Sequence, residues 1–445
     1  ARIPRRLTPS GKNHTIPAML TRSRLLLGLI FICFFVIGFI SNAIGPIIPE
    51  IITSFSLSLT MASLLPFAIY FAYGLISIPA GFLVERFREK NILLFAFILA
   101  FFAGVLITAW TVYISAIIAL FVFGAAMAIM QVSLHPVLRA VGGEEHFGFN
   151  LTIVQLMFGG ASYLSPLVYS ALVRNLHSGD SLGPLLRFLE NATKPGTSWA
   201  SVFTITAFMV LLTLLLLAFT RFPPVKLKEE EKIGSLDSFK ELFRHPHVFL
   251  YALGIFLYVG LEVGLASWIS QYLVTYHGFV PQTTGARAVS WFWGLFTLGN
   301  LATLPLLKLF DAKKILITIS GISLVCFCLA MLGGGTAALI GFLGTSFFIA
   351  PMWPIIFSLG MNSVKMHHGA FSGLLAASII GGAVIPLVVG MVGDAAGLRT
   401  GMMLMFLCLI YVASIGFWAK PIVRNKRTLR KDELRRNAAR TRAGR

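Results

Sequence analysis

The amino-acid sequence predicts an all-α membrane protein whose twelve transmembrane helices form two six-helix bundles. The first observation behind this prediction is composition, because 57% of the 445 residues are hydrophobic and only 12% are charged. Soluble domains contain roughly 25% charged residues, so this chain has too few to cover its surface in water. The composition therefore excludes a soluble enzyme, a disordered protein and a simple DNA-binding module.

The second observation is a series of long apolar runs. A helix needs about 20 apolar residues to cross roughly 30 Å of hydrocarbon. Twelve runs meet this requirement, at residues 25–48, 60–83, 91–112, 114–138, 148–173, 200–220, 247–276, 285–307, 314–333, 335–361, 370–392 and 398–419. Prolines inside these runs, such as Pro351 and Pro386, mark places where a helix is expected to kink or break around a cavity.

The third observation is a polar segment between the sixth and seventh runs, which divides the chain in two. The expected parts are a basic tail (1–24), an N-terminal bundle (25–220), a cytoplasmic linker (221–246), a C-terminal bundle (247–419) and a second basic tail (420–445). A weak internal repeat supports the division, because Pro79 and Pro305, 226 residues apart, each precede an acidic residue by six positions. Two parallel halves are the pattern expected of a secondary transporter.

The distribution of Lys and Arg predicts the orientation in the membrane. With the N-terminus inside, 31 of the 36 Lys and Arg residues lie on the cytoplasmic side and five lie outside. Both termini are therefore expected in the cytoplasm, and the chain is expected to be an integral protein of the plasma membrane, the inner membrane in a bacterium. We expect the basic tail (420–445) to contact anionic lipid and not nucleic acid.

Motifs of catalysis and metal binding are missing from the sequence. The four cysteines fall inside predicted spans and lack the spacing of a metal site. No phosphate-binding glycine loop and no nucleophile paired with a base is recognisable. We therefore expect a protein that is not an enzyme, with no cofactor and no bound metal.

The loop after the second span combines a glycine with several charges. It reads Gly-Phe-Leu-Val-Glu-Arg-Phe-Arg-Glu-Lys, and Gly81, Glu85 and Arg86 are its expected cytoplasmic gate residues. Glycine allows neighbouring helices to approach closely, and the charges can lock or release the two bundles. The loop resembles the signature loop of the major facilitator superfamily, and this resemblance implies the major facilitator fold.

Further motifs resemble the fucose:proton symporter family within that superfamily. They are the PMWPIIFSLG run (Pro351–Gly360), the run with "IIGG" and "DAAG" (379–397), and the YVGLE run (Tyr258–Glu262). The resemblance implies sugar uptake coupled to protons or, in some members, to sodium. The family's helix-one aspartate and helix-four glutamate fall on Gly45 and Gln131, so neither carboxylate is carried over.

Glu262, near the centre of the seventh run, is the only acidic residue that the sequence places in the middle of a span. An ionisable group inside the bilayer is costly and is by default a candidate for function. Loss of water favours its protonated form, and a carboxyl that takes up a proton on one side and releases it on the other can couple transport. The alternative is a neutral Glu262 that only joins two helices through a hydrogen bond.

His135 is the second candidate for proton coupling. It lies one turn after Gln131 on the same helix face. Histidine titrates near neutral pH and can relay protons. The alternative is a histidine at a helix end that simply faces water.

Amide and indole side chains within the spans are candidates for binding the solute. Amides match sugar hydroxyls as donors and acceptors, although they also join helices to one another. Indole rings can stack on a sugar, although tryptophan near a helix end usually anchors the helix at the membrane interface. Together with Glu262, the predicted substrate-binding residues are Asn42, Gln131, Gln155, Gln271, Asn300, Trp268, Trp291 and Trp353. Trp293 ranks below the other three tryptophans.

The sequence thus predicts a secondary active transporter that moves a small polar solute, above all a monosaccharide, by alternating access with proton or sodium coupling. Two alternatives remain open. One is a transporter of the same fold that imports or exports a non-sugar solute such as a drug, a siderophore or a metabolite. The other is a membrane sensor that no longer transports. The expected partners are the solute, the co-transported cation and membrane lipid, and the chain is expected to act as a monomer.

Overall fold

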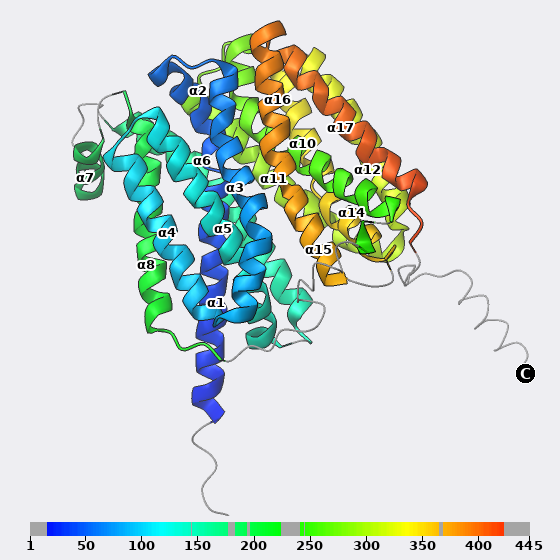
Figure 1. Cartoon of the computed structure of the whole chain (residues 1–445). Coiled ribbons are helices and arrows are strands. Elements are labelled where there is room, and N and C mark those ends of the chain that lie inside the picture. Colours follow the sequence, from blue (N-terminus) through cyan, green and yellow to red (C-terminus); the bar gives the residue numbers. More distant parts are fainter. Residues whose placement is uncertain are drawn as a thin grey trace, which may run out of the picture.

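Helices make up nearly the whole of the computed structural model, which describes residues 16–143, 145–176, 183–193, 196–223, 241–243, 245–364 and 368–421 (Figure 1). Within these residues, eleven helical segments are long and apolar enough to cross a membrane. One further helix, α11 (Ala286–Leu309), has 24 residues and lies outside that set. The predicted all-helical membrane fold is confirmed.

The part of the chain before the linker contributes six long helical segments. α1 (Ile16–Ser41) and α2 (Ile44–Phe55) together make the first. The others are α3 (Leu59–Arg86), α4 (Glu89–Ala109), α5 (Tyr113–Gly142), α6 (Phe147–Asn175) and α8 (Ser201–Phe219), with the short α7 (Pro184–Ala192) and η1 (Ser198–Ala200) before α8. These elements are called the N-terminal half below.

The part after the linker repeats this arrangement. Its long segments are α10 (Pro246–His277), α11, α12 (Ala312–Leu332), α13 (Gly335–Ile349) with α14 (Met352–Met361), α15 (His368–Ala377) with η4 (Ser378–Ile380) and α16 (Gly381–Ala396), and α17 (Leu398–Trp418). The short η3 (Pro281–Gly285) precedes α11. These elements are called the C-terminal half. Residues 1–15 of the first predicted tail, most of the predicted linker and residues 422–445 of the second predicted tail lie outside the described residues.

Proline interrupts three of the segments. A proline lacks an N–H, and its ring clashes with the carbonyl four residues earlier. Pro46 accordingly follows the break at Asn42 between α1 and α2, and Pro386 follows the change of geometry between α15 and α16. Pro351 and Pro354 flank the start of α14. The first of these breaks lies at the centre of the molecule and exposes backbone to a pocket, where irregular backbone in a membrane protein is tolerated.

The first span runs past its predicted end at residue 48 and reaches Phe55. Glu50 therefore lies inside the first span, near its end, whereas Glu262 lies in the middle of the span formed by α10. The predicted end at residue 48 is too early because Pro49 and Glu50 look like the end of a helix in the sequence, whereas Pro49 is accommodated within α2.

The same lysine contact recurs in both halves. Lys90, the second residue of α4, donates from Nζ to the carbonyl oxygens of Ala218 (2.8 Å) and Thr220 (2.7 Å) at the end of α8. Lys313, the second residue of α12, donates in the same way to Phe417 (3.3 Å) and Ala419 (2.6 Å) at the end of α17. A cation at a helix C-terminus satisfies carbonyls that have no partner within the helix. The repetition supports the internal repeat.

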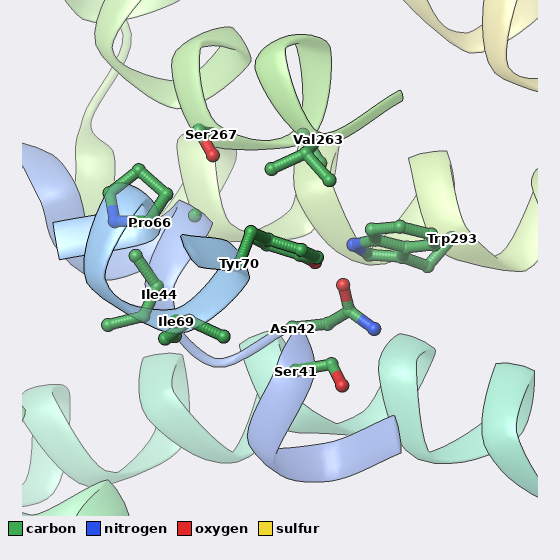
Figure 2. A pocket seen from close by; sticks show the side chains of 11 residues that line it. Ser41, Asn42, Ile44, Pro66, Ile69, Tyr70, Val263, Ser267 and Trp293 are labelled. Carbon is green, nitrogen blue, oxygen red and sulfur yellow. The ribbon is translucent and has the colours of Figure 1, made fainter. Parts of the chain in front are cut away.

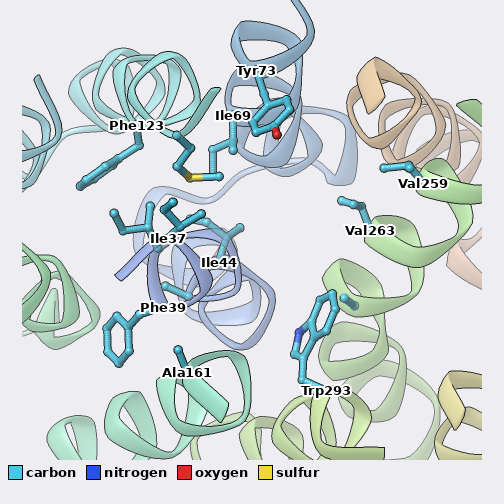
Figure 3. Close-up of a cluster of buried hydrophobic side chains, with 14 of the residues drawn as sticks. Ile37, Phe39, Ile44, Ile69, Tyr73, Phe123, Ala161, Val259, Val263 and Trp293 are labelled. Atoms are coloured by element: carbon cyan, nitrogen blue, oxygen red, sulfur yellow. The ribbon is translucent and has the colours of Figure 1, made fainter. Parts of the chain in front are cut away.

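The two halves pack together mainly through three pairs of helices: α3 with α16, α6 with α11, and α2 with α10. Gly381 permits part of the close packing inside the C-terminal half, because a Cβ atom there would collide with the carbonyl oxygen of Phe256. At the centre, side chains from both halves form one buried cluster, in which Ile44 and Ile69 lie opposite Val263 and Trp293 (Figure 3).

Polar contacts close the junction at one end of the molecule, called the α2 end after the helix that lies there (Figure 1). The Asp394 carboxylate of α16 accepts hydrogen bonds from the backbone N–H groups of Leu59 and Thr60, both at 2.8 Å. These are orphan donors at the start of α3, so the carboxylate caps a helix of the other half. Gln282 of η3 donates to Oε1 of Glu50 on α2 at 3.1 Å.

Candidate functional site

A pocket lies between the two halves at the break between α1 and α2 (Figure 2). The N-terminal half lines it with the break itself and with α3, and the C-terminal half lines it with α10 and α11. Polar side chains from several elements meet in it: Ser41, Asn42, Tyr70, Ser267 and Trp293.

Asn42 is the predicted binding residue that the structure places in this pocket. Its Nδ2 donates to Ser162 Oγ of α6 at 2.7 Å and to the Gly38 carbonyl oxygen at 3.3 Å. The two bonds hold the amide in one orientation, with its oxygen directed toward Tyr70 and Trp293 (Figure 2). Asn42 is therefore both a link between α1 and α6 and an acceptor that faces the pocket.

Trp293 is the main pocket residue that the sequence ranked too low. Its side chain is only 3% exposed, and its indole N–H has no hydrogen-bond partner. A buried donor without a partner costs about 1–3 kcal/mol, and a ligand that accepts from this N–H would remove that cost. Thr297 and Asn300, four and seven positions later, share its helix face, and this polar stripe is the signal that would have singled it out.

Glu262 lies on α10 beside Val263, which lines the pocket, and its side chain is half-buried. The Tyr258 hydroxyl, one turn earlier, interacts with the carboxyl and also donates to the Ala350 carbonyl oxygen at 3.4 Å. Tyr70 of α3 interacts electrostatically with the same carboxyl from the other half. The predicted carboxyl thus lies at the junction of the halves with two tyrosines: Tyr258, which begins the YVGLE run, and Tyr70, which the sequence did not single out.

Gln131 and His135 continue the polar path along α5. Gln131 is half-buried, and its Oε1 accepts a hydrogen bond from the hydroxyl of Tyr73, which lies one turn after Tyr70 on α3. His135 is exposed, with Nδ1 2.7 Å from the Gln131 carbonyl oxygen and its ring edge-to-face with Phe34 at 5.4 Å. Both therefore share one face of α5, as predicted.

Gln155 shows where the two halves separate. Gly159, one turn later on α6, packs directly against Thr297 of α11, whereas Gln155 on the same face is exposed. The junction between α6 and α11 is therefore closed at Gly159 and at Gly294, which packs against Tyr163.

The other predicted binding residues make contacts away from the pocket. Trp268 is fully buried and donates from Nε1 to the Pro386 carbonyl oxygen at 3.2 Å. Gln271 donates to Thr275 of its own helix at 3.0 Å. Asn300 reaches only the Phe296 carbonyl oxygen at 3.5 Å.

The remaining two tryptophans pack against other rings. Trp291 is 50% exposed, and its ring meets Tyr163 edge-to-face at 5.6 Å. Trp353 stacks on Phe357 at 5.0 Å. Neither residue lines the pocket, so a solute-binding role for the two tryptophans stays a prediction.

The predicted gate lies where α3 ends. Gly81 is buried, and Arg86, the last residue of α3, is exposed with its guanidinium 5.9 Å from the centre of the Phe87 ring. The Glu85 side chain lies outside the described residues. The gate role of the three residues therefore stays a prediction. Among the described residues, no group of three or more His, Cys, Asp or Glu side chains could hold a metal ion.

A bundle of membrane-spanning helices in two repeated halves, with a polar pocket midway along their junction, defines the class of membrane transporters. The Major Facilitator Superfamily model matches residues 30–378. The chain belongs to the Major Facilitator Superfamily.

Individual relatives cover most of the chain. It is 28% identical over 388 residues to the glucose/galactose transporter of Brucella abortus biovar 1 (strain 9-941), a match that covers 86% of this chain and 91% of the relative. It is 27% identical to the L-fucose-proton symporter of Escherichia coli (strain K12), with 82% and 86% covered.

The fold is also similar to solved structures. The transporter FucP in the outward conformation matches with a TM-score of 0.65 and 23% identity, over 90% of this chain and 99% of that one. An inward-facing, occupied bacterial homologue of the human lysosomal transporter Spinster matches with a TM-score of 0.70 and 18% identity, over 88% and 96%. These likenesses support the predicted twelve-helix major facilitator fold.

We expect Ser162→Ala to destabilise the protein by about 1–3 kcal/mol, because it leaves the buried Asn42 amide without its closest acceptor. Thermal unfolding of the purified protein in detergent measures the effect. Ser165→Ala is the matched control, since Ser165 is equally buried on α6 but its hydroxyl has no partner. Equal unfolding temperatures for the two variants would contradict the bond between α1 and α6.

Proposed function

We propose that the chain is a proton-coupled importer of a hexose such as glucose or galactose, acting as a single chain and not as an enzyme. The observation that carries this proposal is the pocket between the halves, where an unpaired indole donor, an oriented amide acceptor and a tyrosine converge beside the Glu262 carboxyl. The two relatives, a glucose/galactose transporter and an L-fucose-proton symporter, support the solute class and the proton as coupling ion.

The pocket has the chemistry that a sugar requires. A sugar ring carries hydroxyls around its rim and apolar C–H groups on its faces. Trp293 offers a donor and an aromatic face, and Asn42 offers an amide oxygen opposite it. Ile44, Ile69 and Val263 supply apolar walls. Convergent polar groups on an otherwise apolar wall are typical of a small-molecule site.

The distribution of charge supports a cytoplasmic location for the end of the molecule opposite α2. Arg86 and Arg88 are exposed in the connection between α3 and α4, and Lys90 and Lys313 lie at the same end. Positive residues concentrate on cytoplasmic loops. The α2 end then faces the outside, where Asp394 and Glu50 hold the halves together.

Alternating access follows from this orientation. The junction is closed at the α2 end, and it opens beyond Gly159 toward the other end, where Gln155 and His135 are exposed. The pocket then communicates with the cytoplasm. Rocking of one half on the other would close this side and open the α2 end, so that the sugar meets one solution at a time.

Glu262 is the proposed coupling group. An ionised carboxyl between the halves is costly unless water or a cation reaches it. A proton that binds with the sugar removes this cost while the pocket is closed, and the proton leaves when cytoplasmic water enters. Tyr258 and Tyr70 keep the carboxyl beside the pocket in the meantime.

Uptake into proteoliposomes tests the proposal. With an inward proton gradient, we expect wild-type protein to accumulate radiolabelled glucose or galactose, and Glu262→Gln to abolish accumulation while sugar exchange continues. Exchange survives because it needs no net release of the proton. Glu190→Gln on α7, outside the spans, is the control and should accumulate sugar normally.

Three results would change the conclusion. Unchanged accumulation by Glu262→Gln removes the coupling role from this residue. Accumulation that depends on a sodium gradient and not on the proton gradient would show that sodium is the coupling ion. Absence of any sugar counterflow leaves a non-sugar transporter or a sensor as the function.

Trp293→Phe keeps the aromatic ring but removes the unpaired N–H. We expect it to weaken glucose binding by about 1 kcal/mol, or roughly fivefold, the effect of losing one hydrogen bond to a neutral group. Equilibrium binding to purified protein measures the change. Trp199→Phe is the matched control, because Trp199 is also buried with an unpaired N–H but lies outside the pocket, and it should bind like wild type. A Trp293→Phe variant with unchanged affinity would exclude the indole N–H as a ligand.

A further inference from the structure

Glu50 is a carboxyl inside the first membrane-spanning segment, and the proposed function gives it only a contact that closes the junction. It lies on α2 near the α2 end, in the first span. Its Oε1 accepts from Gln282 across the junction of the halves at 3.1 Å. Its Oε2 is buried and has no hydrogen-bond partner. A buried carboxylate is poorly stabilised when one oxygen has a single neutral donor and the other has no hydrogen bond of good geometry.

The surroundings of Glu50 suit the protonated carboxylic acid better than the carboxylate. Tyr169 of α6 is fully buried, and its hydroxyl lies beside the Glu50 carboxyl without a hydrogen bond of good geometry to it. Gln282 is neutral. Within the described residues no Lys, Arg or His pairs with Glu50, and Arg287, the nearest cation along the chain from η3, is exposed. A protonated Oε2 would gain a donor that Tyr169 can accept.

Water has a route to this carboxyl from the α2 end. An open pocket beside it is lined by Glu50, Thr53 and Ser54 of α2, by Gly196 and Ser198 before and within η1, and by Gln282 with Pro281 of η3. The pocket thus lies between the two halves, as the Glu50–Gln282 bond does. Separation of the halves at this end would break that bond and bring Glu50 into full contact with the outer solution.

We propose that Glu50 is a proton-binding site that controls the outer gate: its protonated form lets α2 and η3 close on each other, and its ionised form drives them apart. The closed state binds a proton that the open state releases, so the two equilibria are linked. A proton from the outside would then permit closure after sugar enters. The inference rests on the proposed function for its orientation, but the gate itself involves no sugar.

A distance measurement without sugar tests the gate. Spin labels at Ile114→Cys on α5 and Leu332→Cys on α12, both strongly exposed near the α2 end, report the separation of the halves by pulsed electron resonance. The native Cys326 and Cys328 are first replaced by Ser, because neither is fully buried. One linked proton changes the closed-to-open ratio by at most tenfold for each unit of pH.

For the labelled wild type, we expect the closed population to fall between about pH 5.5 and about pH 8, within that tenfold limit for each unit. Glu50→Gln imitates the protonated form and should stay closed at both pH values. Glu190→Gln should respond like wild type. A Glu50→Gln protein whose distances follow pH as the wild type does would overturn the proposal.

A second variant keeps the test decisive if Glu50→Gln does not fold. Gln282→Ala removes the donor from the opposite half but leaves the carboxyl, so it should retain the pH response with a smaller closed population throughout. A Gln282→Ala protein with wild-type populations would contradict the proposal. Sugar uptake is measured separately. A pH-dependent gate without sugar transport would contradict only the proposed function. Sugar transport together with an unaltered pH response in Glu50→Gln would contradict only the gate.

Discussion

The free-energy cost of a charge or an unpaired polar group in hydrocarbon is the constraint on which the rest of the structure depends. It explains why the carbonyl oxygens at helix ends accept hydrogen bonds from other segments. Those at the ends of α8 and α17 accept from Lys90 and Lys313. It also explains where helices break. The α1–α2 break at Asn42 lies at the central pocket, where exposed backbone and side-chain groups can meet a polar solute.

The same cost turns a carboxyl at the junction of the halves into a switch. In a closed junction the neutral carboxyl is stable, whereas the ionised carboxyl raises the free energy of the closed conformation. Proton binding and the conformation of the protein therefore depend on each other. Glu262 lies beside the pocket with Tyr70 and Tyr258, and Glu50 lies at the α2 end with Gln282. With one proton-binding carboxyl beside the solute and another at the outer gate, solute binding and gate closure would follow a fixed sequence in the symport cycle.

Much of the fold could be predicted because membrane crossing is a local property of the sequence. Apolar length alone placed the long helices, and the isolated acid in the seventh run identified Glu262. The importance of Trp293 and the membrane position of Glu50 could not be predicted in the same way. Trp293 stands out only because folding buries its N–H without a partner, and Glu50 only because Pro49 is accommodated inside α2. Both facts depend on contacts between distant segments.

Proton movement that accompanies sugar entry is the most direct test of the coupling between carboxyl and solute. Proteoliposomes with equal pH on both sides and a trapped pH-sensitive dye receive glucose or galactose from outside. If a proton travels with each sugar, the internal pH falls as sugar enters, and it stays constant when vesicles without protein receive the same sugar. Sugar entry at an unchanged internal pH would contradict proton coupling and the role of Glu262 that depends on it.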